Sequence, residues 1–277
     1  MSRRWLWLVP LGAAAPRLAV LLYERGSILT SFTEKGDDFA RQFVATGTFG
    51  FVPGQPSAWT QPLYGFFLIP IYWILGRHWW SIGCAQILVA VATAWLVYEI
   101  GRRFVSQRAG LIAAVVATLN PYLIWHDVHI NREILDQLLA AAIVLLTLLC
   151  AERRTLGIAV LLGAVLGLAM LGNTRLVFLP LVVLAYLLWQ ARRFVLRAAV
   201  PLLAACLVVL APWAIRNQVT VGCLTLTTDA RALWKANNPK TYGVLAHGGR
   251  PRDDDLRPAL PGRDERPVSR RGDGVAG

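Results

Sequence analysis

The sequence has few charged residues and few cysteines. Asp, Glu, Lys and Arg make up 16% of its 277 residues, whereas soluble domains average about a quarter. The cysteines lie far apart and form no CxxC pair or other metal-ligand spacing: Cys84, Cys150, Cys206 and Cys223. These scarcities argue against an ordinary soluble domain, a zinc module and a disulfide framework.

Apolar residues make up 56% of the chain instead. They come in blocks of about bilayer-spanning length, not in the short alternating runs of a soluble core. Because an unpaired backbone amide is costly in hydrocarbon, each block is expected to be a helix. We therefore predict an all-α polytopic membrane protein with about seven transmembrane helices. The seven blocks are Trp5–Tyr23, Trp79–Ile100, Ala109–Trp125, Ile134–Cys150, Leu156–Gly172, Leu176–Gln190 and Ala198–Trp213.

The net charge of +12 comes largely from arginine clusters between these blocks. Such clusters are typical of cytoplasmic loops, which argues against a nucleic-acid-binding surface. They fall at every second boundary, so we predict a cell inner membrane protein with a cytoplasmic N-terminus. The first block is interpreted as an uncleaved span and not as a signal peptide. The clusters are Arg3/Arg4, Arg102/Arg103/Arg108, Arg153/Arg154 and Arg192/Arg193/Arg197.

The long segment 24–78 is then external, and one block within it does not fit a simple span. Pro62–Gly76 is apolar but short, contains Pro70, and is rich in aromatic residues. A crossing here would invert every later loop and place the arginine clusters outside. Because aromatic side chains favour the headgroup region, we predict that this first external loop carries interfacial or re-entrant helices.

The composition changes abruptly near Gly248. From there to Gly277 the chain is mostly Arg, Asp, Pro and Gly, which is typical of disorder. We therefore predict a membrane module at residues 1–240 and a disordered or aberrant tail at 241–277, with a truncated or frame-shifted end. The tail contains Asp253-Asp254-Asp255. We do not expect this run to hold a nucleotide-sugar cation, because arginines lie on both sides of it.

Two adjacent carboxylates, Asp37 and Asp38, follow the first span on the external side. They could act as a general base for an acceptor hydroxyl, or hold a divalent cation on a phosphate. They could instead open the helical run Phe39–Ala45 as an N-cap. The residue types leave these alternatives open.

The external turn 126–133 packs two histidines and two carboxylates together. His126, Asp127 and His129 could bind a metal, but polar solvation of a short turn is the favoured interpretation, and no metal site is predicted. Glu133 begins the fourth span and is expected at the mouth of the helix bundle, facing the first loop.

Two arginines occur at external ends of spans, where topology disfavours positive charge. Arg175 opens the sixth span and Arg216 follows the seventh. An arginine fork suits the phosphate oxygens of a lipid. Snorkelling towards headgroups is the equal alternative.

The order of several motifs resembles the GT-C superfamily of integral-membrane glycosyltransferases, in particular its dolichyl-phosphate-mannose protein mannosyltransferase and aminoarabinose transferase group. The motifs are GDDFARQFVATGTFGF (36–51), QPLYGFFLIP (61–70), NPYLIW (120–125), NREIL (131–135), GNTR (172–175), PWAIRN (212–217) and LWKANNP (233–239). The resemblance covers about residues 1–240. It implies a module of seven spans, a polyprenyl-phosphate sugar donor and transfer with inversion.

The resemblance also implies a catalytic base, because an acidic residue in the first external loop has that role in the family. Asp37 or Asp38 would be this base, with Asp38 favoured. The substrate-binding candidates are Glu133, Arg175, Arg216 and Tyr64. The chain departs from the family in two ways: Gln61-Pro62 replaces the lysine that aminoarabinose transferases have there, and family chains run well beyond 277 residues.

We therefore predict an enzyme, a membrane glycosyltransferase that moves a sugar from a polyprenyl-phosphate donor to a glycan, lipid or protein acceptor at the external face. We assign no cofactor and leave a divalent cation open. A transporter-like subunit is an alternative, although such proteins usually place charges or broken helices at mid-membrane. A non-catalytic or truncated membrane protein is the second alternative to a glycosyltransferase.

Overall fold

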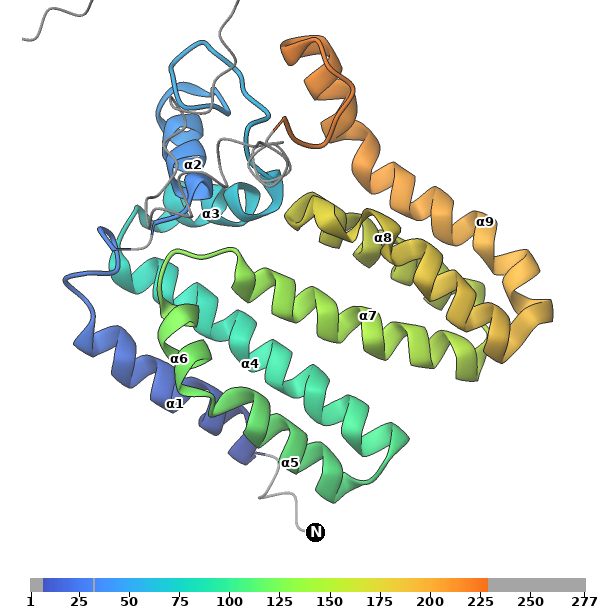
Figure 1. The fold of residues 1–277 in the computed structure, drawn as a ribbon. Coiled ribbons are helices and arrows are strands. Elements are labelled where there is room, and N and C mark those ends of the chain that lie inside the picture. Colours follow the sequence, from blue (N-terminus) through green and yellow to red (C-terminus); the bar gives the residue numbers. More distant parts are fainter. Residues whose placement is uncertain (1–6, 32, 229–277) are drawn as a thin grey trace, which may run out of the picture. The chain divides into compact units, whose positions relative to one another are not determined.

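The computed structural model describes residues 7–31 and 33–228, and this part of the chain is built mainly of helices (Figure 1). Its β-pairing is limited to an isolated bridge between Val52 and Gln55. The all-α prediction is therefore confirmed. The helices are α1 (Leu8–Tyr23), α2 (Lys35–Thr46), α3 (Pro62–Leu75), α4 (Trp79–Phe104), α5 (Gln107–Thr118), α6 (Pro121–Val128), α7 (Glu133–Arg153), α8 (Leu156–Gly172) and α9 (Leu179–Val221), with the 3-10 helix η2 (Thr174–Phe178) before α9.

Some predictions fall on residues that the structure does not describe. The predicted tail at 241–277, with its run Asp253–Asp255, lies there, as do the cluster Arg3/Arg4 and the motif at 233–239. The predicted boundary at residue 240 also lies outside the described residues.

Several helices have the length and composition of membrane spans. α4, α7 and the segment Thr174–Val221 each qualify alone, and α5 with α6 qualify as one span bent by 61°. α1, α3 and α8 are apolar but shorter. The chain is therefore an integral membrane protein. Among the described residues, three helices, or four when the bent pair counts as one span, are long and apolar enough to cross a membrane. The number seven stays a prediction.

The predicted span Ala109–Trp125 is divided into α5 and α6 by a break at Leu119 and Asn120. Asn120 caps α6, because its side-chain oxygen accepts a hydrogen bond from the backbone N–H of Tyr122. Pro121 occupies the first helical position of α6. Both residue types favour a helix start, so the segment bends where a straight helix was expected.

α9 contains both of the last two predicted spans. Its 43 residues would extend roughly 65 Å as one straight helix at ~1.5 Å per residue, about twice the ~30 Å hydrocarbon core. The backbone leaves the helical conformation at Ala191 (φ −147°, ψ 48°), and the chain changes direction there (Figure 1). The two halves correspond to the predicted spans Leu176–Gln190 and Ala198–Trp213.

α8 packs closely against the second half of α9. A Cβ atom added at Gly163 would lie 2.0 Å from the carbonyl oxygen of Leu202, and one at Gly167 would lie 2.9 Å from that of Cys206. The two glycines therefore allow a close approach of the backbones, as small residues do in membrane helix pairs. Buried side chains of both helices, Leu166 among them, belong to one large apolar cluster.

α3 lies across the end of the bundle at which α4 and α7 begin, with α2 packed against it (Figure 1). Leu63 of α3 contacts Gly172 at the end of α8. The buried side of α3, including Tyr72, shares an apolar cluster with residues of α2, α4 and α7. Its far end exposes 79% of both Trp73 and Ile74. We call α2, α3 and the loops beside them the α2–α3 end of the protein. Its exposed aromatic and apolar side chains fit the predicted interfacial position of Pro62–Gly76.

Gly163→Ala should lower the stability of the protein by about 1–3 kcal/mol, because the new methyl group would push against the backbone of α9. Gly157→Ala is the matched control in the same helix, since nothing lies within 4 Å of its Cβ position. It should be neutral, or stabilising by up to about 1 kcal/mol from helix propensity. Thermal unfolding in detergent compares the two. Equal effects would contradict the close approach of α8 and α9.

Candidate active site

Asp37 and Asp38 occupy the first turn of α2 but have different surroundings. Successive residues of an α-helix point about 100° apart. Asp37 is buried, with 2% of its side chain exposed, whereas the side chain of Asp38 is 56% exposed. α2 begins at Lys35 and its N-cap residue is Glu34. Neither aspartate is therefore the N-cap, so the alternative that one of them caps the helical run Phe39–Ala45 is wrong.

Tyr72 of α3 and Arg77, which lies between α3 and α4, hold Asp37. Arg77 donates from Nε to Oδ1 at 2.9 Å and from Nη2 to Oδ2 at 2.6 Å, and the Tyr72 hydroxyl donates to Oδ1 at 2.6 Å. Nη2 of Arg77 also donates to the carbonyl of Leu29 at 3.0 Å. The hydrogen bonds to Asp37 raise the pKa of Arg77, and burial beside Asp37 raises the pKa of Tyr72. Asp37, Arg77 and Tyr72 together form the Asp37 clamp.

Asp38 has a weak partner by comparison. Arg41 lies one turn further along α2, with Nη1 3.8 Å from Oδ1 of Asp38 and 57% of its side chain exposed. Exposed pairs at such a distance contribute little to stability. Of the two aspartates, Asp38 is thus the one that an incoming hydroxyl can reach.

Glu34, which the sequence analysis did not single out, ties the first loop to the start of α7. Its Oε2 accepts a hydrogen bond from the backbone N–H of Arg132 at 2.9 Å, and Nε of Arg132 lies 3.3 Å from Oε1. Nη1 of Arg132 donates to Oε1 of Gln61 at 2.6 Å. Burial raises the pKa of Glu34, and the charge of Arg132 opposes this effect. The polar run 131–133 was the available signal, but it does not identify a partner 98 positions earlier.

The polar turn after α6 does not gather its side chains around a metal position. Asp127 is buried against Arg17, and His129 is buried as well. Within the part of the chain that the structure describes, no three His, Cys, Asp or Glu side chains are grouped to hold a metal ion. Glu133 is 56% exposed, and its Oε2 lies 3.7 Å from Nδ1 of His126.

The two predicted phosphate-binding arginines differ in what they contact. Arg175 in η2 is exposed, and its guanidinium makes no ion pair or hydrogen bond with the described residues. Arg216 of α9 donates to the carbonyls of Phe49 and Ser57, both at 3.0 Å, and lies 4.7 Å from the ring centroid of Trp213. Arg216 therefore fastens the first loop to α9, whereas the charge of Arg175 is available to a ligand.

Tyr64 lies inside the protein. The residue is 2% exposed, and its hydroxyl donates to Oε1 of Gln86 at 2.7 Å. Nε2 of Gln86 donates in turn to the backbone carbonyls of Asp127 and His129. Burial raises the pKa of Tyr64 well above its ordinary value. In this structure Tyr64 supports the turn that follows α6.

A buried ion pair lies deeper in the bundle and was not predicted. Arg17 of α1 is 2% exposed and donates to Oδ2 of Asp127 from Nε at 2.9 Å and from Nη2 at 2.7 Å. Its Nη1 donates to the carbonyls of Ala13 and Thr118 at 3.0 and 3.1 Å. Thr118 ends α5, so Arg17 satisfies a carbonyl that the helix break leaves without its usual partner. Gln137 of α7 donates to Oδ1 of Asp127 at 3.0 Å.

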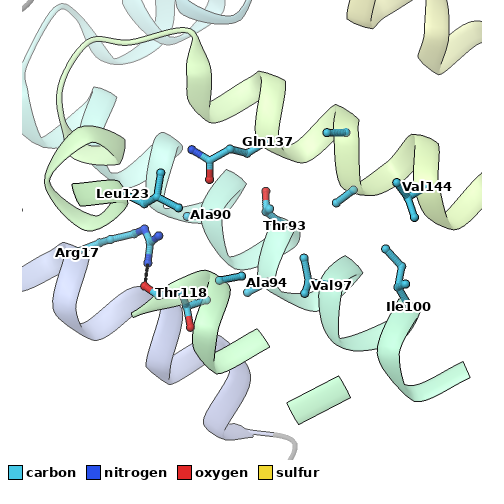
Figure 2. Close-up of a pocket in the computed structure, with 13 residues that line it drawn as sticks. Arg17, Ala90, Thr93, Ala94, Val97, Ile100, Thr118, Leu123, Gln137 and Val144 are labelled. Carbon is cyan, nitrogen blue, oxygen red and sulfur yellow. Dashed lines mark hydrogen bonds between the residues drawn. The ribbon is translucent and has the colours of Figure 1, made fainter. Parts of the chain in front are cut away.

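A cavity of about 360 Å³ adjoins this ion pair and is lined by residues of α1, α4, α5, α6 and α7 (Figure 2). Arg17 and Gln137 contribute polar atoms, and apolar side chains such as Ala94, Val97 and Val144 line most of the remaining wall. None of the predicted site residues lines this cavity. It is therefore distinct from the polar groups of the α2–α3 end.

Comparison with known proteins gives one match. A family model described as dolichyl-phosphate-mannose-protein mannosyltransferase matches residues 57–215, which is more than half of the chain. Tyr64, Arg77, Glu133 and Arg175 lie within the matched segment, whereas the two aspartates of α2 precede it and Arg216 follows it directly. No curated protein and no solved structure matches the chain.

The half-buried Glu34 should make the stability of the α2–α3 end depend on pH. Because burial raises the pKa of Glu34 above its ordinary value, the folded state binds this proton more readily than the unfolded state. The stabilisation is fully present below the unfolded pKa and is lost as the pH rises through the folded pKa. Relative to wild type, Glu34→Gln should therefore gain stability as the pH rises from 4.5 to 7.5.

Thermal unfolding of wild type and of Glu34→Gln across this pH range measures the difference in their stability. The contributions of other titrating groups cancel in this difference. If Glu34→Gln instead became steadily less stable than wild type as the pH rose, the attraction of Arg132 would outweigh the burial of Glu34, and the explanation would be wrong.

Proposed function

Since the chain belongs to the dolichyl-phosphate-mannose-protein mannosyltransferase family, we propose that it transfers a sugar from a polyprenyl-phosphate carrier to an acceptor hydroxyl at the external face of the membrane. The coarser statement follows from the family itself: the protein is a membrane glycosyltransferase of the GT-C type that uses a lipid-linked donor. The geometry of the α2–α3 end supports the assignment of residues to the reaction.

The observation that carries the assignment is an exposed carboxylate, Asp38, next to the fixed Asp37 clamp. A general base must be within reach of the acceptor hydroxyl and able to accept its proton. Asp38 is exposed and has one distant partner, whereas Asp37 is buried and accepts three hydrogen bonds. We therefore assign the base to Asp38 and a positioning role to Asp37.

The leaving group of this reaction is a lipid phosphate, and Arg175 supplies an exposed cation for it. A planar guanidinium suits two phosphate oxygens at once. Arg216 supports the site through the first loop, because carbonyl oxygens already occupy its donors. In our assignment the exposed Glu133 contacts the acceptor, and Tyr64 shapes the site from beneath.

We also propose an inner-membrane protein with a cytoplasmic N-terminus and a catalytic module at residues 1–240. The clusters Arg102/Arg103 and Arg153/Arg154 lie at the ends of α4 and α7 that are away from the α2–α3 end. Basic residues on the cytoplasmic side are the expected pattern. The scheme uses no cofactor, and a divalent cation between Asp38 and the donor phosphate stays open.

The buried Arg17–Asp127 pair and the bend between α5 and α6 favour transport as a second candidate function. Charges and broken helices at membrane depth are frequent in transporters. In this structure, however, the charges neutralise each other and their hydrogen bonds are largely occupied by protein atoms. Movement of a labelled sugar lipid between the leaflets of a vesicle, without sugar transfer, would support this second function.

Asp38→Asn should reduce sugar transfer by about 10²–10⁴-fold, the usual contribution of a general base. Asp37→Asn should reduce transfer less and should lower thermal stability, because Arg77 loses its partner. The measurement uses purified protein in lipid with a panel of labelled polyprenyl-phosphate sugars. Glu152→Gln, an exposed carboxylate at the other end of α7, is the control and should transfer sugar as wild type does.

Two results would change the assignment. Normal transfer by Asp38→Asn, together with loss of transfer in a folded Asp37→Asn, would move the base to Asp37. Wild-type protein that neither transfers sugar from any donor nor retains a lipid donor would support the non-catalytic alternative.

A further inference from the structure

Arg77, an arginine of the α2–α3 end that was not among the predicted site residues, has donor capacity to spare. It uses Nε and Nη2 on Asp37 and Leu29, whereas its Nη1 makes no hydrogen bond within the described residues. The side chain of Arg77 is 24% exposed, so it is not enclosed by the protein. The two N–H groups of Nη1 therefore have no hydrogen-bond partner in the part of the chain that the structure describes.

The orientation of Arg77 is set before any ligand arrives. Asp37 binds it through both carboxylate oxygens, Tyr72 holds one of these oxygens, and the Leu29 carbonyl accepts a further hydrogen bond. A guanidinium held in this way loses little conformational freedom on binding. Asp37 and Asp38 are neighbours in the chain, about 3.8 Å apart at Cα. The fixed arginine and the proposed base therefore belong to one small region.

We propose that Arg77 binds the phosphate of the lipid-linked donor through Nη1, and that Asp37 and Tyr72 are positioning residues for it. The inference rests on the proposed function, because it requires a phosphate-bearing donor. Arg77 would thus be a second phosphate-binding residue besides Arg175. The Asp37 clamp would then have a role in donor binding as well as in stability. Phosphate is the ligand class because a planar fork with free N–H groups matches phosphate oxygens.

The charge changes of the reaction favour a cation at this position. The acceptor oxygen attacks the anomeric carbon while Asp38 takes the hydroxyl proton. The bond between the anomeric carbon and the phosphate oxygen breaks, and its electron pair stays on that oxygen. A singly charged phosphodiester thus becomes a phosphate monoester with up to one further negative charge, as Asp38 becomes neutral. Because negative charge grows on the phosphate, Arg77 stabilises the transition state more than the bound donor.

Asp37 has an opposing effect on affinity. Its negative charge lies against Arg77 and partly neutralises the attraction of this arginine for phosphate. Removal of that charge should strengthen phosphate binding, although it loosens the orientation of Arg77. If Asp37 served stability alone, removal of its charge would not raise the affinity for phosphate.

The test measures the binding of polyprenyl phosphate to the full chain in lipid nanodiscs, with neutral polyprenol as the reference lipid. Sugar transfer and thermal unfolding are recorded for each variant. Arg77→Gln should bind polyprenyl phosphate at least about tenfold more weakly, since charge-assisted hydrogen bonds are lost. Arg77→Lys, which keeps the charge but not the fork, should fall in between. Arg25→Gln removes an equal charge from an exposed arginine of the same external segment and should bind as wild type does.

Asp37→Asn should bind polyprenyl phosphate more tightly, on the order of tenfold, because a nearby like charge is removed. The double variant Asp37→Asn/Arg77→Gln should bind as weakly as Arg77→Gln. It leaves no unpaired buried charge, so it remains informative if Arg77→Gln does not fold. An arginine with a structural role alone would let the double variant recover wild-type binding.

Wild-type affinity for polyprenyl phosphate in the double variant or in a folded Arg77→Gln would overturn this inference. So would an Asp37→Asn variant that binds no more tightly than wild type. If the wild type still transfers sugar, these results leave the proposed function intact. Wild-type protein that neither transfers sugar nor binds polyprenyl phosphate would overturn both.

Discussion

The Arg17–Asp127 ion pair is the interaction on which the arrangement of the α2–α3 end depends. Buried charges are tolerated when they pair with each other and their remaining hydrogen bonds are satisfied. Arg17 joins α1 to the last carbonyl of α5 and to α6, and Asp127 also accepts a hydrogen bond from Gln137 of α7. The pair thereby stabilises the bend between α5 and α6, and this bend sets the position of the carbonyls that Gln86 binds.

From that bend, a series of hydrogen bonds leads to the candidate base. Gln86 holds Tyr64 on α3, and Tyr72, about two turns further along the same helix, holds Asp37 on α2. α3 is thus fixed against α4 and the turn after α6, and α2 is fixed against α3. The accessible carboxylate of Asp38 follows Asp37 directly. The position of Asp38 is therefore set by contacts that begin inside the bundle.

Residue types predicted the helices and the end of the bundle at which polar groups gather, but not the pairs that these groups form. The pair Asn120-Pro121 was a visible helix-start signal, which a reading of block lengths alone passed over. Arg17 was visible as a charge in an apolar block, yet its partner lies 110 positions away. The residue types alone did not distinguish Asp37 from Asp38, and the two differ in the structure because α2 turns Asp37 inward. Such distinctions depend on how helices pack, which spacing along the chain does not encode.

In the proposed topology, the change of direction at Ala191 sets the distance between the first loop and the opposite membrane surface. Arg192 and Arg193, exposed just after the turn, belong in one headgroup layer, and Arg216 holds the first loop at the other end of the same helix. These arginines, 192 and 216, are roughly 36 Å apart along a helix with ~1.5 Å per residue, slightly more than the ~30 Å hydrocarbon core. The second half of α9 is thus a spacer of nearly constant length. In a thinner or thicker bilayer, the helix would have to tilt or the lipids deform before the loop could change its depth.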